Sequence, residues 1–124
     1  MPCDYVVDNK RMLVITTASG VLTAAEAFAH QASLAVDPGF NPGFYQLIDF
    51  TEVEKLAIST DDLRRLAKKT IFLPRVRRAM LVKGSMLYGV ARMLASFREL
   101  AGGKEEVKIF QDRKEAMDWL GVSI

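Results

Sequence analysis

The chain has 124 residues, of which 50% are hydrophobic and 26% are charged, and its formal net charge is +2. This length is typical of one domain, and this composition fills a single core and excludes a disordered chain. The single cysteine, Cys3, excludes an internal disulfide, and no apolar run is long enough to span a bilayer. We therefore expect one domain over residues 1–124, soluble and cytoplasmic, with no signal peptide and no transmembrane segment.

Strand and helix signals alternate along the chain, beginning with a hairpin. Two short β-prone runs, Tyr5–Val7 and Met12–Thr17, flank a turn-forming segment and predict an antiparallel hairpin that ends by Gly20. Thr23 and Glu26 have the spacing of a capping box, which predicts a helix start. Helical spacing then predicts an apolar face made of Ala25, Phe28, Ala29, Ala32 and Val36.

Three further strand–helix units follow. Strands are expected over Tyr45–Phe50, Ala79–Val82 and Val107–Phe110, where apolar residues run almost without interruption. Residues suited to cap the helices that follow are Ser59, Ser85 and Asp112. The apolar face expected for the helix after Ser85 comprises Met86, Val90, Met93, Leu94, Phe97 and Leu100.

The resulting order, β-β-α-β-α-β-α-β-α, determines the fold class. Strands that are separated by helices run parallel to one another, because each crossover returns the chain to the same edge of the sheet. We therefore predict an α/β domain with a mostly parallel five-stranded sheet, an N-terminal hairpin and four helices.

Few residues are suited to catalysis or to metal binding. His30 is the single histidine and stands apart from other ligand types in the sequence, so neither a metal cluster nor a histidine-based triad is expected. We place His30 at the surface or at its boundary. Cys3 has no histidine near it in sequence and is expected to be inert. The sequence thus predicts no cofactor, no metal and no enzymatic activity.

Asp49 is the carboxylate that stands out, because it ends an apolar strand. Ligands of open parallel sheets gather at the carboxyl ends of the strands. The same edge is expected to present Thr51, Ser59, Thr60, Ser85 and Tyr88. In the alternative interpretation, Asp49 accepts hydrogen bonds from loop amides and holds the crossover in shape.

Several of these segments together resemble a known family. The leading hairpin, the Tyr45-Gln46-Leu47-Ile48-Asp49 strand, the serine-bearing helix start and the closing Ala116-Met117-Asp118-Trp119-Leu120 helix are similar to the STAS/SEC14-type, SpoIIAA-like family. The Asp37–Phe44 and Tyr88–Met93 segments fit the bacterial branch of that family. The resemblance covers almost the whole chain and implies a single STAS-type domain.

The resemblance implies two kinds of function. In regulatory members, a serine at the start of the helix after the Asp-ended strand is phosphorylated, and the matching segment here is Ile58-Ser59-Thr60-Asp61. This segment departs from the regulatory motif, which has Asp before its serines and Gly after them, so an ordinary N-cap is the alternative. The likeness to lipid-binding SEC14 domains implies a carrier or sensor of a small apolar or anionic ligand, with the methionine-bearing third helix along a groove.

The distribution of charge suggests an interaction surface. Between Leu63 and Phe97 there are nine cations and no acid. Helical spacing places four of them, Arg64, Arg65, Lys68 and Lys69, on or beside one exposed helix face. The cations expected near that face are Arg75, Arg77, Arg78 and Lys83. Because the segment contains no acid, we expect that only acids from elsewhere in the fold could neutralise it.

Two functional hypotheses follow. The leading one is a non-enzymatic protein-interaction or regulatory module that binds a protein partner through the start of the second helix and the adjacent basic surface. The alternative is a carrier or sensor of a small anionic or apolar, lipid-like ligand. Pairing with a second copy of the chain stays open, and nucleic acid is not expected, because aromatic residues do not interleave with the cations apart from Phe72.

Overall fold

The computed structural model describes residues 3–100, 102 and 104–122. Strands and helices follow one another in the predicted order. They are β1 (Cys3–Asp8), β2 (Leu13–Thr23), α1 (Ala24–Ala35), β3 (Tyr45–Ala57), α2 (Thr60–Lys68), β4 (Arg77–Leu81), α3 (Ser85–Leu100), β5 (Glu106–Phe110) and α4 (Arg113–Leu120). Three predicted helix starts are confirmed, because Thr23 and Glu26 form the reciprocal capping box, and Ser59 and Asp112 are N-caps.

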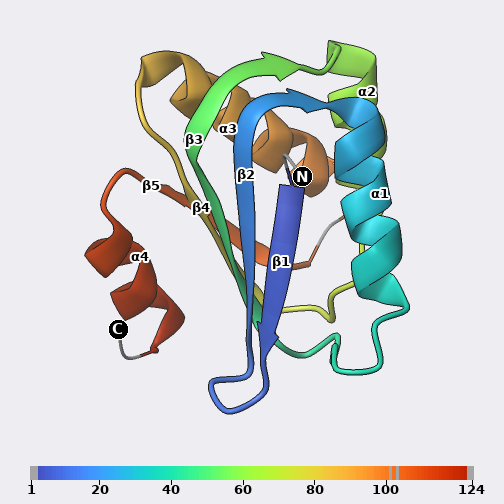
Figure 1. Cartoon of the computed structure of the whole chain (residues 1–124), viewed down its shortest axis with the longest axis vertical. Coiled ribbons are helices and arrows are strands. Elements are labelled where there is room, and N and C mark those ends of the chain that lie inside the picture. Colours follow the sequence, from blue (N-terminus) through green and yellow to red (C-terminus); the bar gives the residue numbers. More distant parts are fainter. Residues whose placement is uncertain (1–2, 101, 103, 123–124) are drawn as a thin grey trace.

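The five strands form one sheet in the order β1-β2-β3-β4-β5. β1 is antiparallel to β2 and the other three pairs are parallel, which confirms the predicted mixed sheet. Each helical crossover leads to the next strand of the sheet, and crossovers of this kind are right-handed almost without exception. Because all three advance across the sheet in the same direction, α1, α2 and α3 lie on one face (Figure 1).

The fourth helix packs on the other face of the sheet, against β3, β4 and β5 (Figure 1). Successive side chains of a strand point to opposite faces, so the same strands supply two different layers. We call the side under α4 the α4 face and the opposite side the three-helix face. The buried core of the α4 face consists of Leu13, Leu47, Ala79, Leu81, Phe110, Ala116, Met117 and Leu120. Trp119 is half-buried and packs against this core.

Two strands, β2 and β3, continue well past their predicted ends. β2 continues through Gly20 to Thr23, and β3 continues past Phe50 to Ala57. Gly20 has a φ of +63°, and the β2–β3 register shifts on both sides of it, so the residue expected to end the strand instead forms an irregularity within it. Past their pairings with β1 and β4, the two strands stay paired with each other and curve toward the starts of α1 and α2 (Figure 1). The prediction stopped early because charged residues interrupt the apolar pattern of β3 after Phe50.

The side of α1 that was predicted to be buried is not the side that faces the sheet. Ala25, Ala29 and Ala32 are exposed, and Val36 lies after the helix with 80% of its surface exposed, whereas Phe28 is half-buried. The side chains directed at the sheet are those of Ala27, His30, Gln31 and Leu34. The inward face therefore includes two polar residues, while the alanines that dominate this helix are too small to fix its orientation by hydrophobicity.

The predicted face of α3 is also only partly correct. Leu94 and Phe97 are partly buried as expected, whereas Met93 and Leu100 are exposed. Among the side chains of this helix that the structure describes, the buried ones are those of Ala91 and Arg98. The Met86 side chain, which was expected on this face, lies outside the described residues, as does that of Leu87.

Candidate functional site

The structure does not bring the predicted edge site together. Asp49 lies within β3 rather than at its end, and both of its carboxylate oxygens have partners. Oδ1 accepts hydrogen bonds from the Thr51 amide at 2.9 Å and the Thr51 hydroxyl at 2.6 Å, and Oδ2 pairs with Arg113 Nη1 at 3.0 Å. The alternative interpretation fits better, because this carboxylate holds the backbone after it and connects β3 to the start of α4.

The other predicted site residues lie on helix starts. Ser59 Oγ accepts a hydrogen bond from the Asp62 amide at 3.1 Å, which is the ordinary N-cap contact. Thr60 is the exposed first residue of α2, Ser85 is the exposed first residue of α3, and Tyr88 is exposed one turn further along. Because β3 extends from Asp49 to Ala57 before α2 begins, the expected common edge does not form. Phosphorylation of Ser59 or Thr60 stays a prediction.

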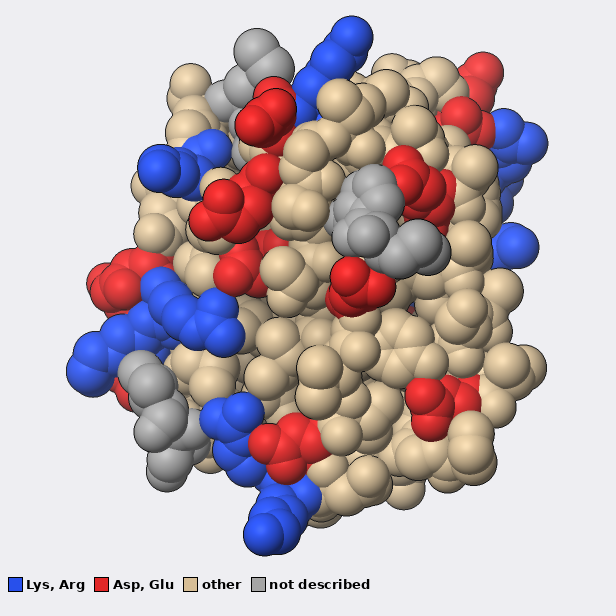
Figure 2. All heavy atoms as spheres, in the orientation of Figure 1, with Lys and Arg blue, Asp and Glu red and all other residues tan. Residues whose placement is uncertain are grey.

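The basic face of α2, defined as Arg64, Arg65, Lys68 and Lys69, is exposed as predicted. The expectation that only acids from elsewhere in the fold could neutralise it is wrong, because Arg64 pairs with Asp61 at 3.0 Å and Arg65 pairs with Asp62, both in the same helix. Both acids lie just before the cationic segment and one helical turn from their partners. At the upper right of Figure 2, where α2 lies in Figure 1, basic and acidic side chains are adjacent.

Arg78 was expected near this basic surface and is instead buried on the three-helix face, 9% exposed. It belongs to a buried polar chain that consists of His30, Thr16, Gln46 and Arg78. Arg78 Nε donates to Gln46 Oε1 at 2.9 Å, and Gln46 Nε2 donates to Thr16 Oγ1 at 2.9 Å. Thr16 Oγ1 in turn lies 2.9 Å from His30 Nε2. Four polar side chains are thus linked from β4 across β3 and β2 to α1.

Strand register explains why these residues meet. Gln46 and Arg78 are direct partners in the β3–β4 pair. The partner of Gln46 on β2 is Val14, and Thr16 lies two residues after Val14 on the same face of that strand. An arginine can only donate, so the Gln46 carbonyl faces Arg78 and its amide faces Thr16. In the neutral His30 tautomer that carries its proton on Nδ1, the Thr16 hydroxyl donates to His30 Nε2, and every hydrogen bond of the chain then points away from Arg78.

The electrostatics of the chain follow from burial. Burial lowers the pKa of Arg78 to about 10, a change that the nearby Glu105 partly offsets and Arg98 reinforces. The group therefore stays charged at neutral pH. Its guanidinium carbon lies 4.7 Å from the centre of the Phe72 ring. Burial, together with the charge of Arg78, lowers the pKa of His30, which favours the neutral imidazole.

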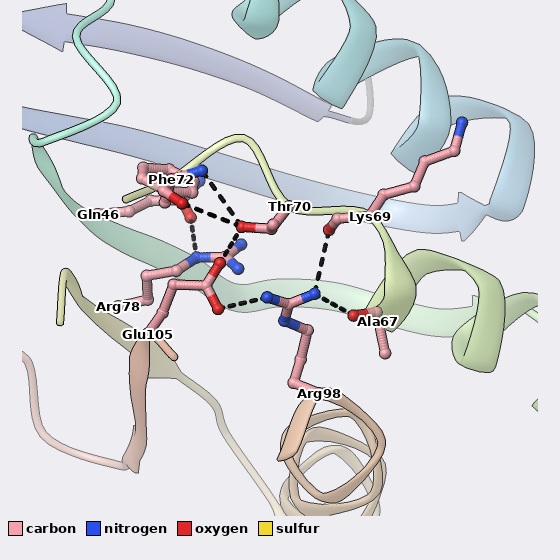
Figure 3. A network of polar contacts seen from close by, with 8 residues as sticks. All are labelled: Gln46, Ala67, Lys69, Thr70, Phe72, Arg78, Arg98 and Glu105. Carbon is pink, nitrogen blue, oxygen red and sulfur yellow. Dashed lines mark hydrogen bonds and ion pairs between the residues drawn. The ribbon is translucent and has the colours of Figure 1, made fainter. Parts of the chain in front are cut away.

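A buried ion pair lies beside this chain (Figure 3). The side chains of Arg98 and Glu105 are 7% and 2% exposed, and Arg98 Nη2 donates to Glu105 Oε2. Arg98 Nη1 also donates to the Ala67 and Lys69 carbonyl oxygens, and the Thr70 hydroxyl donates to Glu105 Oε1. Burial alone would raise the pKa of Glu105, but the hydrogen bonds from Arg98 and Thr70 outweigh it and the pKa is lowered. The pair connects α3 to the end of α2 and to the start of β5.

A cavity of about 110 Å³ lies between the sheet and the three helices. Most of its lining is apolar, from residues such as Ile48, Phe50, Leu63, Met80 and Leu94. Its polar lining comprises Thr16, His30, Gln31, Gln46, Arg78 and Arg98. Among the described residues, two buried polar atoms have no hydrogen-bond partner, Gln31 Oε1 and Arg98 Nε, and both belong to side chains of this lining. The cavity thus combines apolar walls with unsatisfied polar groups.

Sequence reasoning missed this site. One signal was present, because Gln46 stands in a strand predicted to be covered, where a polar side chain has no solvent to face. Arg78 precedes the predicted Ala79–Val82 strand by one residue, whereas β4 begins at Arg77. Within the described part of the chain, no group of three or more His, Cys, Asp or Glu side chains could hold a metal ion. No helix among those residues has both the length and the apolar character needed to cross a membrane.

A scan of the sequence against protein-family models finds no match, and a search of curated proteins finds none either. Among solved structures, the chain is similar to an uncharacterized DUF3478-family protein with a SpoIIAA-like fold from Shewanella loihica PV-4, with a TM-score of 0.62. The two chains are 23% identical over 95% of this chain and 91% of the other. The chain therefore has a SpoIIAA-like fold, as the sequence resemblance implied.

Proposed function

We propose that this domain binds a small, mostly apolar molecule in the cavity of the three-helix face, as a non-enzymatic carrier or sensor. The observation that carries the proposal is the cavity itself, which lies between the sheet and helices α1, α2 and α3. An apolar cavity of about 150 Å³ binds benzene in another protein, and the cavity here is of the same order of size. Binding there would be driven by removal of apolar ligand surface from water.

The polar groups on the cavity wall support a binding role over a purely structural one. A buried donor or acceptor without a partner costs about 1–3 kcal/mol, and a buried charge costs more. Arg98 Nε and Gln31 Oε1 are such atoms, and they lie at a cavity where a ligand could satisfy them. An apolar wall would be more stable, so the polar groups are accounted for if they recognise a ligand.

Two measurements on the purified full chain test this proposal. Native mass spectrometry should detect a retained small molecule, or the thermal melt should rise when 1-hexanol or toluene is added. Ala91→Leu places a larger side chain in the cavity wall and should remove the rise in melting temperature. A clean unliganded mass, together with an unchanged melt for every apolar molecule tried, would rule the proposal out.

A second candidate function is the protein-interaction or regulatory module, and the basic face of α2 favours it. Lys68 and Lys69 have no ion-pair partner among the described residues, and all four cations of this face are exposed. We rank this candidate second because Asp61 and Asp62 neutralise two of the four charges. Pull-down of a protein partner by a variant with reversed charges on this face tests this candidate.

A further inference from the structure

We propose that the ligand carries a single carboxylate, which binds at the polar end of the cavity beside Arg78, with an aliphatic or aromatic remainder along the apolar walls. This inference rests on the proposed binding function and specifies its ligand class. It follows from the balance of buried charge, from the free donors of two guanidiniums and from the chemistry of the cavity lining.

The buried charge on this face is not balanced. Arg78 and Arg98 are both buried, and one buried carboxylate, that of Glu105, lies close to them. Glu105 forms its ion pair with Arg98, so Arg78 has a neutral amide as its hydrogen-bonded partner. Figure 3 shows these groups in one network. One positive charge is left over, and an unpaired charge in a protein interior is costly. A monoanion would neutralise it.

The donors that a carboxylate needs are present. Among the described residues, the Arg78 guanidinium makes one hydrogen bond, through Nε, which leaves its Nη groups without a partner. Arg98 Nε is also without a partner there. Both arginines line the cavity, whereas Glu105 does not. Guanidiniums bind carboxylates through paired, charge-assisted hydrogen bonds, which are stronger than neutral ones.

The charge balance also distinguishes between anions. A phosphate monoester carries close to two negative charges at pH 7, and it would leave this face with an excess of negative charge in place of the positive one. A neutral molecule would leave Arg78 unpaired. The cavity volume of about 110 Å³ and its apolar lining suit a short hydrocarbon group rather than a second polar one. A small monocarboxylic acid satisfies all three conditions.

The first test compares hexanoate with 1-hexanol on the unmodified chain by isothermal titration calorimetry. The two molecules share their hydrocarbon chain and differ in the group that would meet Arg78. Hexanoate should bind about tenfold more tightly or better, the ratio expected for a buried charge-assisted hydrogen bond. Equal affinities would contradict the proposal that the ligand carries a carboxylate and would leave the proposed binding function intact. Failure of both molecules to bind would count against the binding function itself.

The second test uses two adjacent arginines of β4 that point to opposite faces. Arg78→Met should abolish the preference for hexanoate while 1-hexanol still binds. Arg77→Met is the matched control, since Arg77 lies outside the cavity, pairs with Glu106 and donates to the Trp119 carbonyl oxygen. The Arg77→Met variant should keep the preference for hexanoate. A preference that survives Arg78→Met would contradict the proposal. The comparison on the unmodified chain holds whether or not the Arg78 variant folds.

Discussion

The two faces of the sheet are built from alternate residues of the same strands, yet they differ in chemistry. The buried core of the α4 face contains apolar side chains such as Leu47 and Ala79. The three-helix face holds a buried polar chain, a buried ion pair and a cavity, and Gln46 and Arg78 are direct sequence neighbours of those apolar residues. One face is thus an apolar core, whereas the other combines apolar clusters with buried polar groups and a cavity, and the period of two residues in a β-strand keeps them separate.

The largest expected effect is on the buried ion pair. Glu105→Gln removes the carboxylate and leaves Arg98 and Arg78 both without a nearby acid, so we expect it to lower the free energy of unfolding by about 3–5 kcal/mol. Glu106→Gln is the matched control, because Glu106 is exposed and pairs with Arg77 at 3.5 Å, where the loss should stay below about 1 kcal/mol. Urea denaturation measures the free energy of unfolding of both variants. Equal losses would contradict the expected difference between the buried and the exposed ion pair.

The second prediction compares the space available on each face. Ala91→Leu adds carbon atoms beside the cavity and should leave the free energy of unfolding nearly unchanged or slightly higher. Ala116→Leu adds the same atoms to the α4 face, where Ala116 is fully buried in the apolar core, and should cost about 1–3 kcal/mol by overpacking. If both substitutions cost the same when measured by denaturation, the two faces are equally well packed.

The third prediction concerns pH. The pKa of Glu105 is lower in the folded protein than its ordinary value of 4.5, so the unfolded chain takes up this proton more readily. The stabilisation is therefore complete above the ordinary pKa and is lost as pH falls through the folded pKa. The stability gap between the unmodified chain and Glu105→Gln should be constant from pH 7 to about 5 and shrink below that.

Acid titration of both proteins, followed by denaturation at each pH, measures this gap. Taking the difference removes the contributions of other carboxyls whose pKa is lowered, such as Asp8 and Asp37. A gap that stays constant down to pH 3 would mean that the Glu105 carboxylate does not stabilise the fold.

The smallest effect on stability is expected outside both faces, on the basic face of α2. Reversing Arg65 and Lys69 to Glu should change the free energy of unfolding by less than about 1 kcal/mol, because both side chains are exposed. If α2 is an interaction surface, the same change abolishes recovery of a protein partner in a pull-down. The charge-matched control is the double variant Lys10→Glu and Lys108→Glu, which should still recover the partner. If the partner is recovered by the variant with reversed charges on α2, this candidate function is ruled out.

The fold was largely predictable because its signals are local. Caps such as Thr23 and Ser59, and apolar runs such as Leu47-Ile48, depend on residues close together in sequence. The site was not predictable in the same way. Gln46 and Arg78 meet only through the register of two strands, and His30 reaches Thr16 only because it lies on the face of α1 that is directed at the sheet. An alanine-rich helix carries too little hydrophobic contrast to show that orientation in its sequence.

The place of α4 after all five strands in the sequence affects how the protein is made. Each strand pairs with the strand that precedes it in sequence, so the sheet can grow in the order in which the ribosome delivers it. The helix that covers Leu13, Leu47 and Ala79 comes last, within Arg113–Leu120. Until these residues leave the exit tunnel, a nascent chain that has already formed β1 to β4 exposes the apolar sheet surface that α4 later covers. Premature termination before α4 would make that exposure permanent.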